Sequence, residues 1–383
     1  MTKVLVGMSG GVDSSVAAAL LVEAGHQVTG AYMKNWTLDV PGMQCPWAED
    51  LAYAKRTAVK LGIDLRVYDF QEAYKRDVVD YLVREYEAGR TPNPDIMCNQ
   101  DVKFGLFLDT ALNEGFDYIA TGHYAQVGNA GEAQAEPAQP RQAEPVRPAQ
   151  AEPVQPRQPE STHPMCHLLR ATDDHKDQTY FLYRMGQRAL QHTLFPLGAY
   201  TKDQVREMAT QRDLPAAQKP DSQGICFIGE APIQDFLRMY VEPNPGKIID
   251  ADTSEVVGAH DGALFFTLGQ RKGLGVGGGQ PYYVVGKDMA ANEVYVSHNP
   301  RAESLQTTEL KLENCTWLDG ETPAEGSYLV RTRHTGQLVE ARFVPQGEAG
   351  ATINFSTPQE RVAPGQSVVL YQDKICLGGG IVA

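Results

Sequence analysis

The residues best suited to chemistry lie in a glycine- and serine-rich loop near the N-terminus and in two loops that each carry a cysteine. The first loop, Gly7–Ser14, follows the apolar run Val4–Val6 and precedes a helical pattern. Glycines let the backbone approach an anion closely, and the N-terminus of a helix supplies N–H donors and a positive dipole end. No lysine follows the glycines as a Walker A loop requires. The sequence therefore predicts a phosphate-binding loop of another class.

Cys98 lies in the turn-rich stretch Thr91–Asn99, which enters a helix with Asp95 as the expected N-cap. A cysteine in the first turn of a helix has a lowered pKa and a larger thiolate fraction. Cys226 lies in a second loop, Pro220–Gly229. Taken alone, each cysteine is more often a small buried hydrophobe than a nucleophile, so the residues themselves leave both interpretations open. The six cysteines lack Cys-x-x-Cys spacing, and neither a disulfide framework nor a metal site is expected.

Composition limits the class of protein. The chain has 383 residues, 42% of them hydrophobic and 21% charged, which predicts two or three globular domains. Its longest strongly apolar stretch, Val16–Val22, is far shorter than the ~20 residues of a membrane span, and the N-terminus lacks a signal-peptide pattern. We therefore expect a cytoplasmic protein without a membrane partner. The net charge of −14 argues mildly against loose nucleic-acid binding, unless positive charge is clustered around Arg271, Lys272, Arg331 and Arg333.

The first half of the chain alternates strand and helix patterns, which indicates a parallel sheet covered on both faces. The expected strands are Val4–Val6, Val28–Met33 and Leu65–Phe70, and the expected helices are Val16–Glu23 ended by Gly25, Trp47–Leu61 ended by Gly62, and a segment around Val78–Val83. Residues 128–163, rich in Ala, Glu, Gln and Pro, read as a disordered surface insertion without a necessary function.

Short alternating runs replace the helical patterns beyond about residue 240, which is typical of small antiparallel sheets or a barrel. These runs are Ala263–Thr267, Tyr282–Val285, Glu293–Val296, Tyr328–Arg333, Val339–Val344, Ala351–Phe355 and Ser367–Tyr371. The expected fold is an α/β catalytic domain (residues 1–230), a small central linker domain (231–297) and a C-terminal antiparallel β-barrel (298–383).

A series of motifs resembles one enzyme family. Ser-Gly-Gly-x-Asp-Ser in the first loop is similar to the pyrophosphate-binding (PP-loop) motif of the ATP pyrophosphatase superfamily. With that loop and both cysteine loops, the following segments resemble the bacterial tRNA-specific 2-thiouridylases from end to end, apart from residues 128–163: Lys34–Trp36, Ala120–Tyr124, Lys176–Leu182, Phe266–Gly275 and Cys376–Gly380.

The resemblance implies a sulfurtransferase with a PP-loop domain of the adenine-nucleotide hydrolase type. Such an enzyme adenylates the C2 oxygen of the wobble uridine with magnesium-ATP and then replaces it with persulfide sulfur, releasing AMP and pyrophosphate. Cys226 would carry the persulfide, Cys98 would be the partner nucleophile that forms a transient disulfide with it, and Asp95 would be the general acid or base. The implied ATP-binding residues are Gly7, Met8, Ser9, Gly10, Gly11, Val12, Asp13, Ser14, Met33 and Gly122.

The implied tRNA contacts are Asn93, Pro94 and Asp95 at the target base, together with His123, Lys176, Asp177, Gln178, Arg333, His334 and Gln366. His334 stands where the family often has tyrosine, and Pro220 and Gln223 replace a commoner lysine and a hydroxyl residue beside Cys226. The partners implied are tRNAs for Lys, Glu and Gln, together with a cysteine desulfurase or a sulfur-relay protein. The enzyme itself is expected to be a monomer.

Two other functions remain open on the sequence. An ATP-dependent ligase or amidotransferase of the same superfamily would use a nitrogen nucleophile and would need neither Cys98 nor Cys226. A non-catalytic RNA-binding protein could keep the nucleotide loop as a vestige, although intact Ser9, Asp13 and Ser14 disfavour this.

Overall fold

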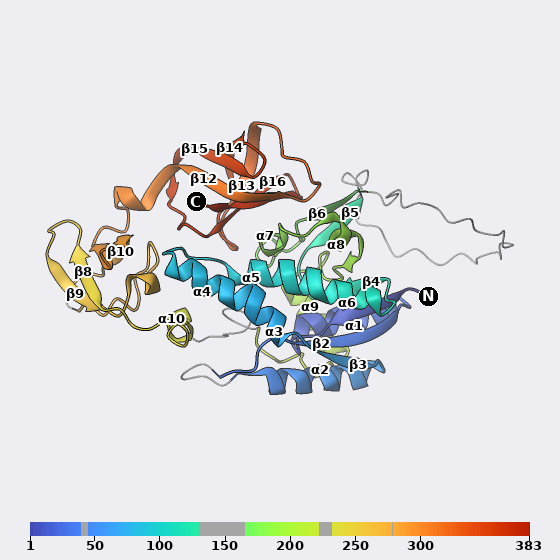
Figure 1. Cartoon of the computed structure of the whole chain (residues 1–383). Helices are drawn as coiled ribbons and strands as arrows, with labels where there is room; N and C mark the ends of the chain where they lie inside the picture. The colour runs from blue at the N-terminus through green and yellow to red at the C-terminus, as the bar shows by residue number, and fades with distance from the viewer. Residues whose placement is uncertain (40–44, 130–164, 222–231, 278) are drawn as a thin grey trace.

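The structure is a computed structural model that describes residues 1–39, 45–129, 165–221, 232–277 and 279–383. Figure 1 shows an α/β part in blue and green, a small central part in yellow, and a β-rich C-terminal part in orange and red beside helices α4 and α5. The predicted succession of a parallel-sheet domain, a small central domain and a C-terminal barrel is confirmed.

The N-terminal sheet is entirely parallel, with strand order β3-β2-β1-β4-β7. Its strands are β1 (Lys3–Gly7), β2 (Gln27–Lys34), β3 (Leu65–Asp69), β4 (Tyr118–Ala120) and β7 (Thr193–Leu194). Val4, Leu5 and Val6 of β1 are fully buried because helices cover both faces. The strand order reverses between β1 and β4, so the loops that follow these two strands meet at one edge, where ligands bind in such sheets.

The helices of this domain extend the predicted pattern. They are α1 (Val12–Glu23), α2 (Trp47–Leu61), α3 (Gln71–Tyr74), α4 (Asp80–Glu87), α5 (Pro94–Met97), α6 (Phe107–Asn113), α7 (Thr179–Leu182), α8 (Gln187–Gln191) and α9 (Lys202–Gln211). A further helix, α10 (Ile233–Leu237), precedes the central sheet. The first begins at Val12 rather than Val16, because Val12, Ser14 and Ser15 already face the core. Gly25 and Gly62 end their helices with positive φ, as expected.

Two π-helical stretches interrupt the region between β3 and β4: Lys75–Val79 and Cys98–Leu106. The second follows α5 directly and begins at Cys98. Wide helical turns of this kind are uncommon and occur frequently at functional sites.

A two-stranded hairpin carries the predicted insertion. Strand β5 (Gln126–Asn129) pairs with β6 (Cys166–Leu169), and residues 130–164 lie outside the described residues. The expected start of the insertion at residue 128 is therefore wrong, because Gly128 and Asn129 pair with His167 and Cys166 in the ladder.

The central part is a four-stranded mixed sheet of order β10-β11-β8-β9. Its strands are β8 (Gly246–Asp250), β9 (Val256–His260), β10 (Tyr283–Asp288) and β11 (Glu293–Ser297), and β8 and β11 are parallel, contrary to the antiparallel expectation. The expected strand Ala263–Thr267 is also wrong: Ala263–Phe265 forms a 3₁₀ turn. Ala263, Leu264 and Phe265 are all buried, so this apolar run lacks the alternation of a half-exposed strand.

The C-terminal part is a closed six-stranded antiparallel barrel, because β12 pairs with both β15 and β17. Its strands are β12 (Gln306–Trp317), β13 (Gly326–Arg331), β14 (Val339–Gln346), β15 (Gly350–Glu360), β16 (Ser367–Gln372) and β17 (Ile375–Val382). The glycines of β17 have a steric reason: a Cβ added at Gly378 or Gly379 would collide with the backbone of a neighbouring strand. Beyond the barrel, β17 also pairs with β6 of the N-terminal part.

Candidate active site

The predicted phosphate loop connects β1 to α1 at the carboxyl edge of the sheet. The Ser14 hydroxyl lies 3.2 Å from the Ser9 amide nitrogen and donates to the Gly11 carbonyl, so the side chains brace the loop internally. Gly10 adopts φ +77°, and an added Cβ would meet the backbone of Asp50. Met8 and Val12 are 1% and 3% exposed, so these two predicted ATP residues can offer a ligand only their backbone.

Met33 and Gly122, the predicted adenosine-side residues, lie beside this loop. Gly122 follows β4, and a Cβ placed on it would lie 2.7 Å from the Ser14 nitrogen. A side chain there would cover the first turn of α1. The Met33 methyl group lies 3.3 Å from the corresponding point on Gly7. The sheet edge therefore leaves the helix N-terminus accessible between the two loops.

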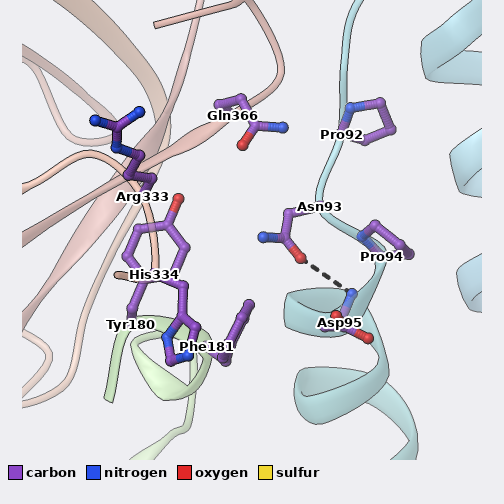
Figure 2. Close-up of a pocket in the computed structure, with 9 residues that line it drawn as sticks. All are labelled: Pro92, Asn93, Pro94, Asp95, Tyr180, Phe181, Arg333, His334 and Gln366. Carbon is purple, nitrogen blue, oxygen red and sulfur yellow. Dashed lines mark hydrogen bonds between the residues drawn. The ribbon is translucent and has the colours of Figure 1, made fainter. Parts of the chain in front are cut away.

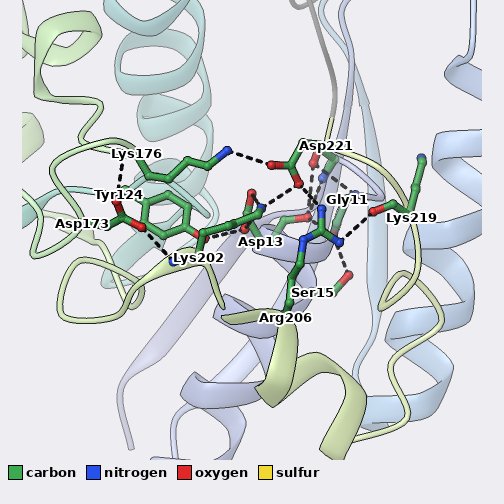
Figure 3. A network of polar contacts seen from close by, with 12 residues as sticks. Gly11, Asp13, Ser15, Tyr124, Asp173, Lys176, Lys202, Arg206, Lys219 and Asp221 are labelled. Atoms are coloured by element: carbon green, nitrogen blue, oxygen red, sulfur yellow. Dashed lines mark hydrogen bonds and ion pairs between the residues drawn. The ribbon is translucent and has the colours of Figure 1, made fainter. Parts of the chain in front are cut away.

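A network of charged side chains surrounds the phosphate loop, and sequence reasoning missed most of it (Figure 3). Lys202 Nζ lies 2.7 Å from Asp13 Oδ1 and 2.9 Å from Asp221 Oδ1. Arg206 and Lys176 also bind the Asp221 carboxylate, at 2.6 and 2.9 Å. Four positive side chains thus gather where a polyphosphate would lie: Lys176, Lys202, Arg206 and Lys219, the last paired with Asp50.

One sequence signal could have located Lys202. Thr201 and Gln204 form a capping box, the Thr-x-x-Gln pattern that marks a helix start, and this places Lys202 on the first residue of α9. Burial by itself would raise the pKa of Asp221, but hydrogen bonds from Lys176 and Lys202 outweigh it and lower that pKa to about 2. Asp221 is therefore a fixed negative charge at neutral pH. The segment that follows, residues 222–231 with Gln223 and Cys226, lies outside the described residues.

The loop before Cys98 is capped differently from the prediction. The N-cap of α5 is Asn93 rather than Asp95, because the Asn93 side chain accepts a hydrogen bond of 3.1 Å from the Asp95 amide. Pro94 occupies the first helical position, where its missing N–H costs nothing. The side chain that caps α5 is therefore an amide, not the Asp95 carboxylate.

Cys98 is 1% exposed, and its expected lowered pKa is wrong. It lies past the first turn of α5, at the start of the π-helical stretch. Burial raises the pKa of the Cys98 thiol, and the nearby positive charge of Lys103 offsets this in part. The resting thiol is therefore protonated and enclosed, and must be uncovered before it can react. None of the described cysteines forms a disulfide with another described cysteine.

A cavity of about 230 Å³ brings the predicted target-base residues 93–95 together with three predicted tRNA contacts from a distant part of the chain (Figure 2). Asn93 and Asp95 line one wall, and Arg333, His334 and Gln366 of the barrel part line the other. Its complete lining is Pro92, Asn93, Pro94, Asp95, Tyr180, Phe181, Arg333, His334 and Gln366. The cavity combines aromatic faces, a carboxylate, an amide and a guanidinium, which together suit an unpaired nucleobase.

The His334 ring lies 4.4 Å from the Phe181 ring, centroid to centroid. Burial, followed by the positive charge of Arg331, lowers the His334 pKa, so the imidazole is neutral at pH 7. Arg333 is mostly exposed and pairs at 3.0 Å with Glu360, which is more exposed still. Such surface pairs are weak, and a phosphate could displace Glu360.

Asp177 lies in the core instead of facing solvent. Its carboxylate binds Arg331 at 2.7 Å, with both side chains almost completely buried, and accepts hydrogen bonds from the Thr179 hydroxyl and the Ala171 amide. Arg331 therefore cannot belong to the expected surface cluster of positive charge. The pair joins the α/β part to strand β13, so in this structure Asp177 has no surface to offer a tRNA.

The remaining predicted tRNA residues divide between surface and interior. Lys176 is 40% exposed beside the phosphate network. Gln178 accepts a hydrogen bond of 2.9 Å from the Tyr124 amide, so its side chain carbonyl is engaged internally. His123 bonds Thr121 at 2.8 Å and packs between Phe104 and Phe195, where burial lowers its pKa well below the usual range.

No described helix is both long and apolar enough to span a membrane. Within the same residues, no three His, Cys, Asp or Glu side chains converge as a metal site would require.

Comparison with known proteins gives the same order of parts. Residues 2–230 match a family profile described as a tRNA methyl transferase HUP domain, residues 234–298 a tRNA methyl transferase PRC-barrel domain, and residues 307–382 an aminomethyltransferase beta-barrel domain. Three similar proteins carry the name tRNA-specific 2-thiouridylase MnmA. That of Verminephrobacter eiseniae is 42% identical, covering 100% of this chain and 98% of its own length.

The protein of Nitrosomonas europaea is 41% identical, covering 100% of this chain and 98% of its own length. That of Acinetobacter baumannii is 43% identical over 99% of this chain and 96% of its own length. The matches run through all three parts of the fold, which confirms the resemblance carried by the motifs. This chain belongs to the tRNA-specific 2-thiouridylase family.

Proposed function

We propose that this protein is a tRNA 2-thiouridylase that adenylates the C2 oxygen of wobble uridine and replaces that oxygen with sulfur. The cavity of Figure 2 is the observation that carries the proposal, because residues 93–95, expected at the target base, line it together with three expected tRNA contacts of the barrel part. The phosphate loop and its charged network supply the other half of the chemistry. A flipped-out base is the substrate form that such a cavity accepts.

ATP is the activating substrate. The amides at the start of α1 and the positive side chains of Lys176, Lys202 and Lys219 offset the charge of its phosphates. Mg²⁺ commonly uses one or two carboxylates together with substrate phosphates, and Asp13 in the loop fits that role. Tyr124 donates a hydrogen bond to Asp13, which leaves the other carboxylate oxygen for Lys202 or for an incoming ion.

The first step forms a bond between the uridine O2 and the α-phosphorus and breaks the bond to pyrophosphate. Asp95, facing the cavity, takes the N3 proton, so the base becomes an O2-adenylated intermediate. Pyrophosphate leaves toward the positive network. A poor leaving group, the carbonyl oxygen, has then become a good one in the form of AMP.

The second step transfers sulfur. The Cys98 thiolate attacks the Cys226 sulfur of the Cys226 persulfide and forms a Cys98–Cys226 disulfide, which releases hydrosulfide. Hydrosulfide attacks C2 and AMP departs with the oxygen. The proton on sulfur is lost to solvent as the C2 thione forms, and Asp95 returns its proton to N3. The two cysteines supply the two electrons that reduce persulfide sulfur, so a thiol reductant must reopen the disulfide before the next turnover.

The finer assignments belong to the same proposal. We expect tRNAs for Lys, Glu and Gln as substrates, a cysteine desulfurase or a sulfur-relay protein as donor, action as a monomer, and a cytoplasmic location. The limits of the three domains, at residues 230 and 297, are likewise part of it. Lys176, Arg333, His334 and Gln366 are the residues we expect at the tRNA, and Asn93 and Pro94 those beside the base.

Mass spectrometry of nucleosides tests the proposal. Unmodified glutamate tRNA is incubated with magnesium-ATP and a persulfide source, using the wild type and Cys226→Ser. We expect 2-thiouridine to form with the wild type alone, and AMP to be released in proportion to the 2-thiouridine formed. AMP without sulfur in both proteins would favour the ligase, and tRNA binding without AMP would favour the non-catalytic RNA-binding protein.

A further inference from the structure

Thr91 attaches the loop that carries Asn93 and Asp95 to the other two parts of the molecule. Its amide donates a hydrogen bond of 2.7 Å to the carbonyl of Pro364 in the barrel part. Its carbonyl accepts one of 2.6 Å from the side chain of Gln366. Its hydroxyl lies 3.2 Å from that of Thr267 in the central part. Backbone and side chain of Thr91 thus join three regions far apart in the sequence.

The barrel side of this junction is held firmly. Gly365 donates to the Val382 carbonyl at 2.9 Å, and Val382 donates to the Gln366 carbonyl at 2.8 Å, so β17 fixes the turn from which the Gln366 side chain projects. Arg90, next to Thr91, binds Glu313 of β12 at 2.6 Å. Gly365 has φ +92°, and a Cβ on it would lie 2.9 Å from the Thr91 nitrogen. The two segments touch backbone to backbone.

The central side of the junction is a short turn. Thr267 donates its amide to the Gln270 side chain at 3.0 Å, and the amide group of Gln270 donates to the Lys272 carbonyl at 2.9 Å. This turn presents Arg271 and Lys272 to solvent. Displacing Thr91 would therefore move the base loop relative to both the barrel wall of the cavity and this turn.

We propose that Thr91 is the positioning residue of the target-base loop, and that its bonds to Pro364, Gln366 and Thr267 set the separation of the two cavity walls. The expected effect on thiolation rests on the proposed function, whereas the positioning of the loop by Thr91 does not depend on it. Thr91 itself does not line the cavity, and neither does Gly365 or Thr267. Their variants can therefore alter the cavity without removing a group that would touch the base.

The decisive variant is Gly365→Ala, with Gly347→Ala as its matched control. Both glycines lie in turns of the barrel part with positive φ, at +92° and +68°, so alanine strains both. At Gly347 an added Cβ meets nothing within 4 Å, whereas at Gly365 it meets Thr91. A difference between the variants therefore reports the contact with Thr91 rather than backbone strain.

We expect Gly365→Ala to lower kcat/KM for tRNA at least tenfold below Gly347→Ala, while KM for ATP stays the same in both. Hydrogen exchange of the peptide covering residues 91–98 should be faster in Gly365→Ala than in Gly347→Ala. Equal kcat/KM and equal exchange in the two variants would overturn the proposal. If the wild type forms no 2-thiouridine, the proposed function fails, and the exchange measurement still decides whether Thr91 holds the loop.

Thr91→Val and Thr267→Val test the same junction in case Gly365→Ala does not fold. Each removes one hydroxyl of the same hydrogen bond and keeps a branched side chain of similar shape. We expect each substitution to reduce kcat/KM for tRNA severalfold with an unchanged KM for ATP. The kcat/KM of the double variant should be no lower than that of the less active single variant. Additive losses would show that the two hydroxyls act separately, and this would overturn their part of the junction.

Discussion

The phosphate end and the base end of the active site are built in opposite ways. The phosphate loop is one continuous stretch whose serines and glycines brace one another between β1 and α1. The base cavity is assembled from segments near residues 92, 180, 333 and 366, and it depends on contacts between parts of the fold. Damage to the domain contacts should therefore impair tRNA use first and leave ATP binding largely intact.

The largest expected effect is at the buried pair that fastens β13 to the α/β part. Arg331→Ala leaves the buried Asp177 carboxylate without its closest partner, which costs on the order of 3–5 kcal/mol in such pairs. We expect a large fall in the urea midpoint of unfolding and the loss of thiolation. Replacing both residues, in Asp177→Leu with Arg331→Met, should cost less than Arg331→Ala. A midpoint unchanged by Arg331→Ala would mean that the pair does not fasten the barrel.

At the phosphate end, Lys202→Met tests the charged network. Charge-assisted hydrogen bonds are worth about 1.5–3 kcal/mol, so we expect ATP affinity to fall roughly ten- to a hundredfold while tRNA affinity changes little. Isothermal titration with ATP and with tRNA separates the two. Lys60→Met, at a half-exposed surface pair with Asp213, is the control and should bind ATP like the wild type. Equal ATP losses in both variants would remove Lys202 from the phosphate site.

Arg333→Ala sharpens the comparison at the base end. The side chain is 66% exposed, so the loss should be a severalfold weaker tRNA binding and a salt dependence shallower by about one phosphate contact. Arg342 has the same exposure, 67%, and a similar pair with Glu325, but it does not line the cavity. Binding titrations at several salt concentrations should show no change of slope for Arg342→Ala. Identical slopes for both variants would remove Arg333 from the tRNA contact.

The smallest effect concerns the pH dependence of Cys98. Because burial raises the pKa of the Cys98 thiol, its thiolate fraction in the free enzyme grows at a higher pH than that of an exposed cysteine. Alkylation by iodoacetamide, followed by peptide mass spectrometry, should therefore reach its half-maximal rate at a higher pH than alkylation of a free thiol. A midpoint below pH 8 would show that the resting structure already activates this cysteine.

The sequence was sufficient for features that depend on neighbours along the chain. The phosphate loop, the parallel sheet and the helix-ending glycines Gly25 and Gly62 are of this kind. It failed where tertiary contacts decide. Nothing local distinguishes Arg331, which is buried, from Arg333, which is exposed two residues later.

Some strands of the barrel could be recognised from the sequence and others could not. In β12 the alternation of apolar residues is clear only at Leu310 and Leu312, and β17 contains three successive glycines. Neither sequence has the run of β-branched and aromatic residues that is typical of a strand. Barrel closure stabilises both. The capping of α5 by Asn93 rather than Asp95 was equally undecidable, because both residue types are common caps two positions apart.

The pairing of β6 with β17 has a consequence for synthesis on the ribosome. Leu168 and Leu169 complete their ladder with Cys376 and Ile375, which are translated long after them. One edge of the β5–β6 hairpin therefore stays exposed until residues 375 and 376 have been synthesised. A version truncated before residue 375 should keep that edge open and self-associate, so the C-terminal strand also protects the nascent protein from aggregation.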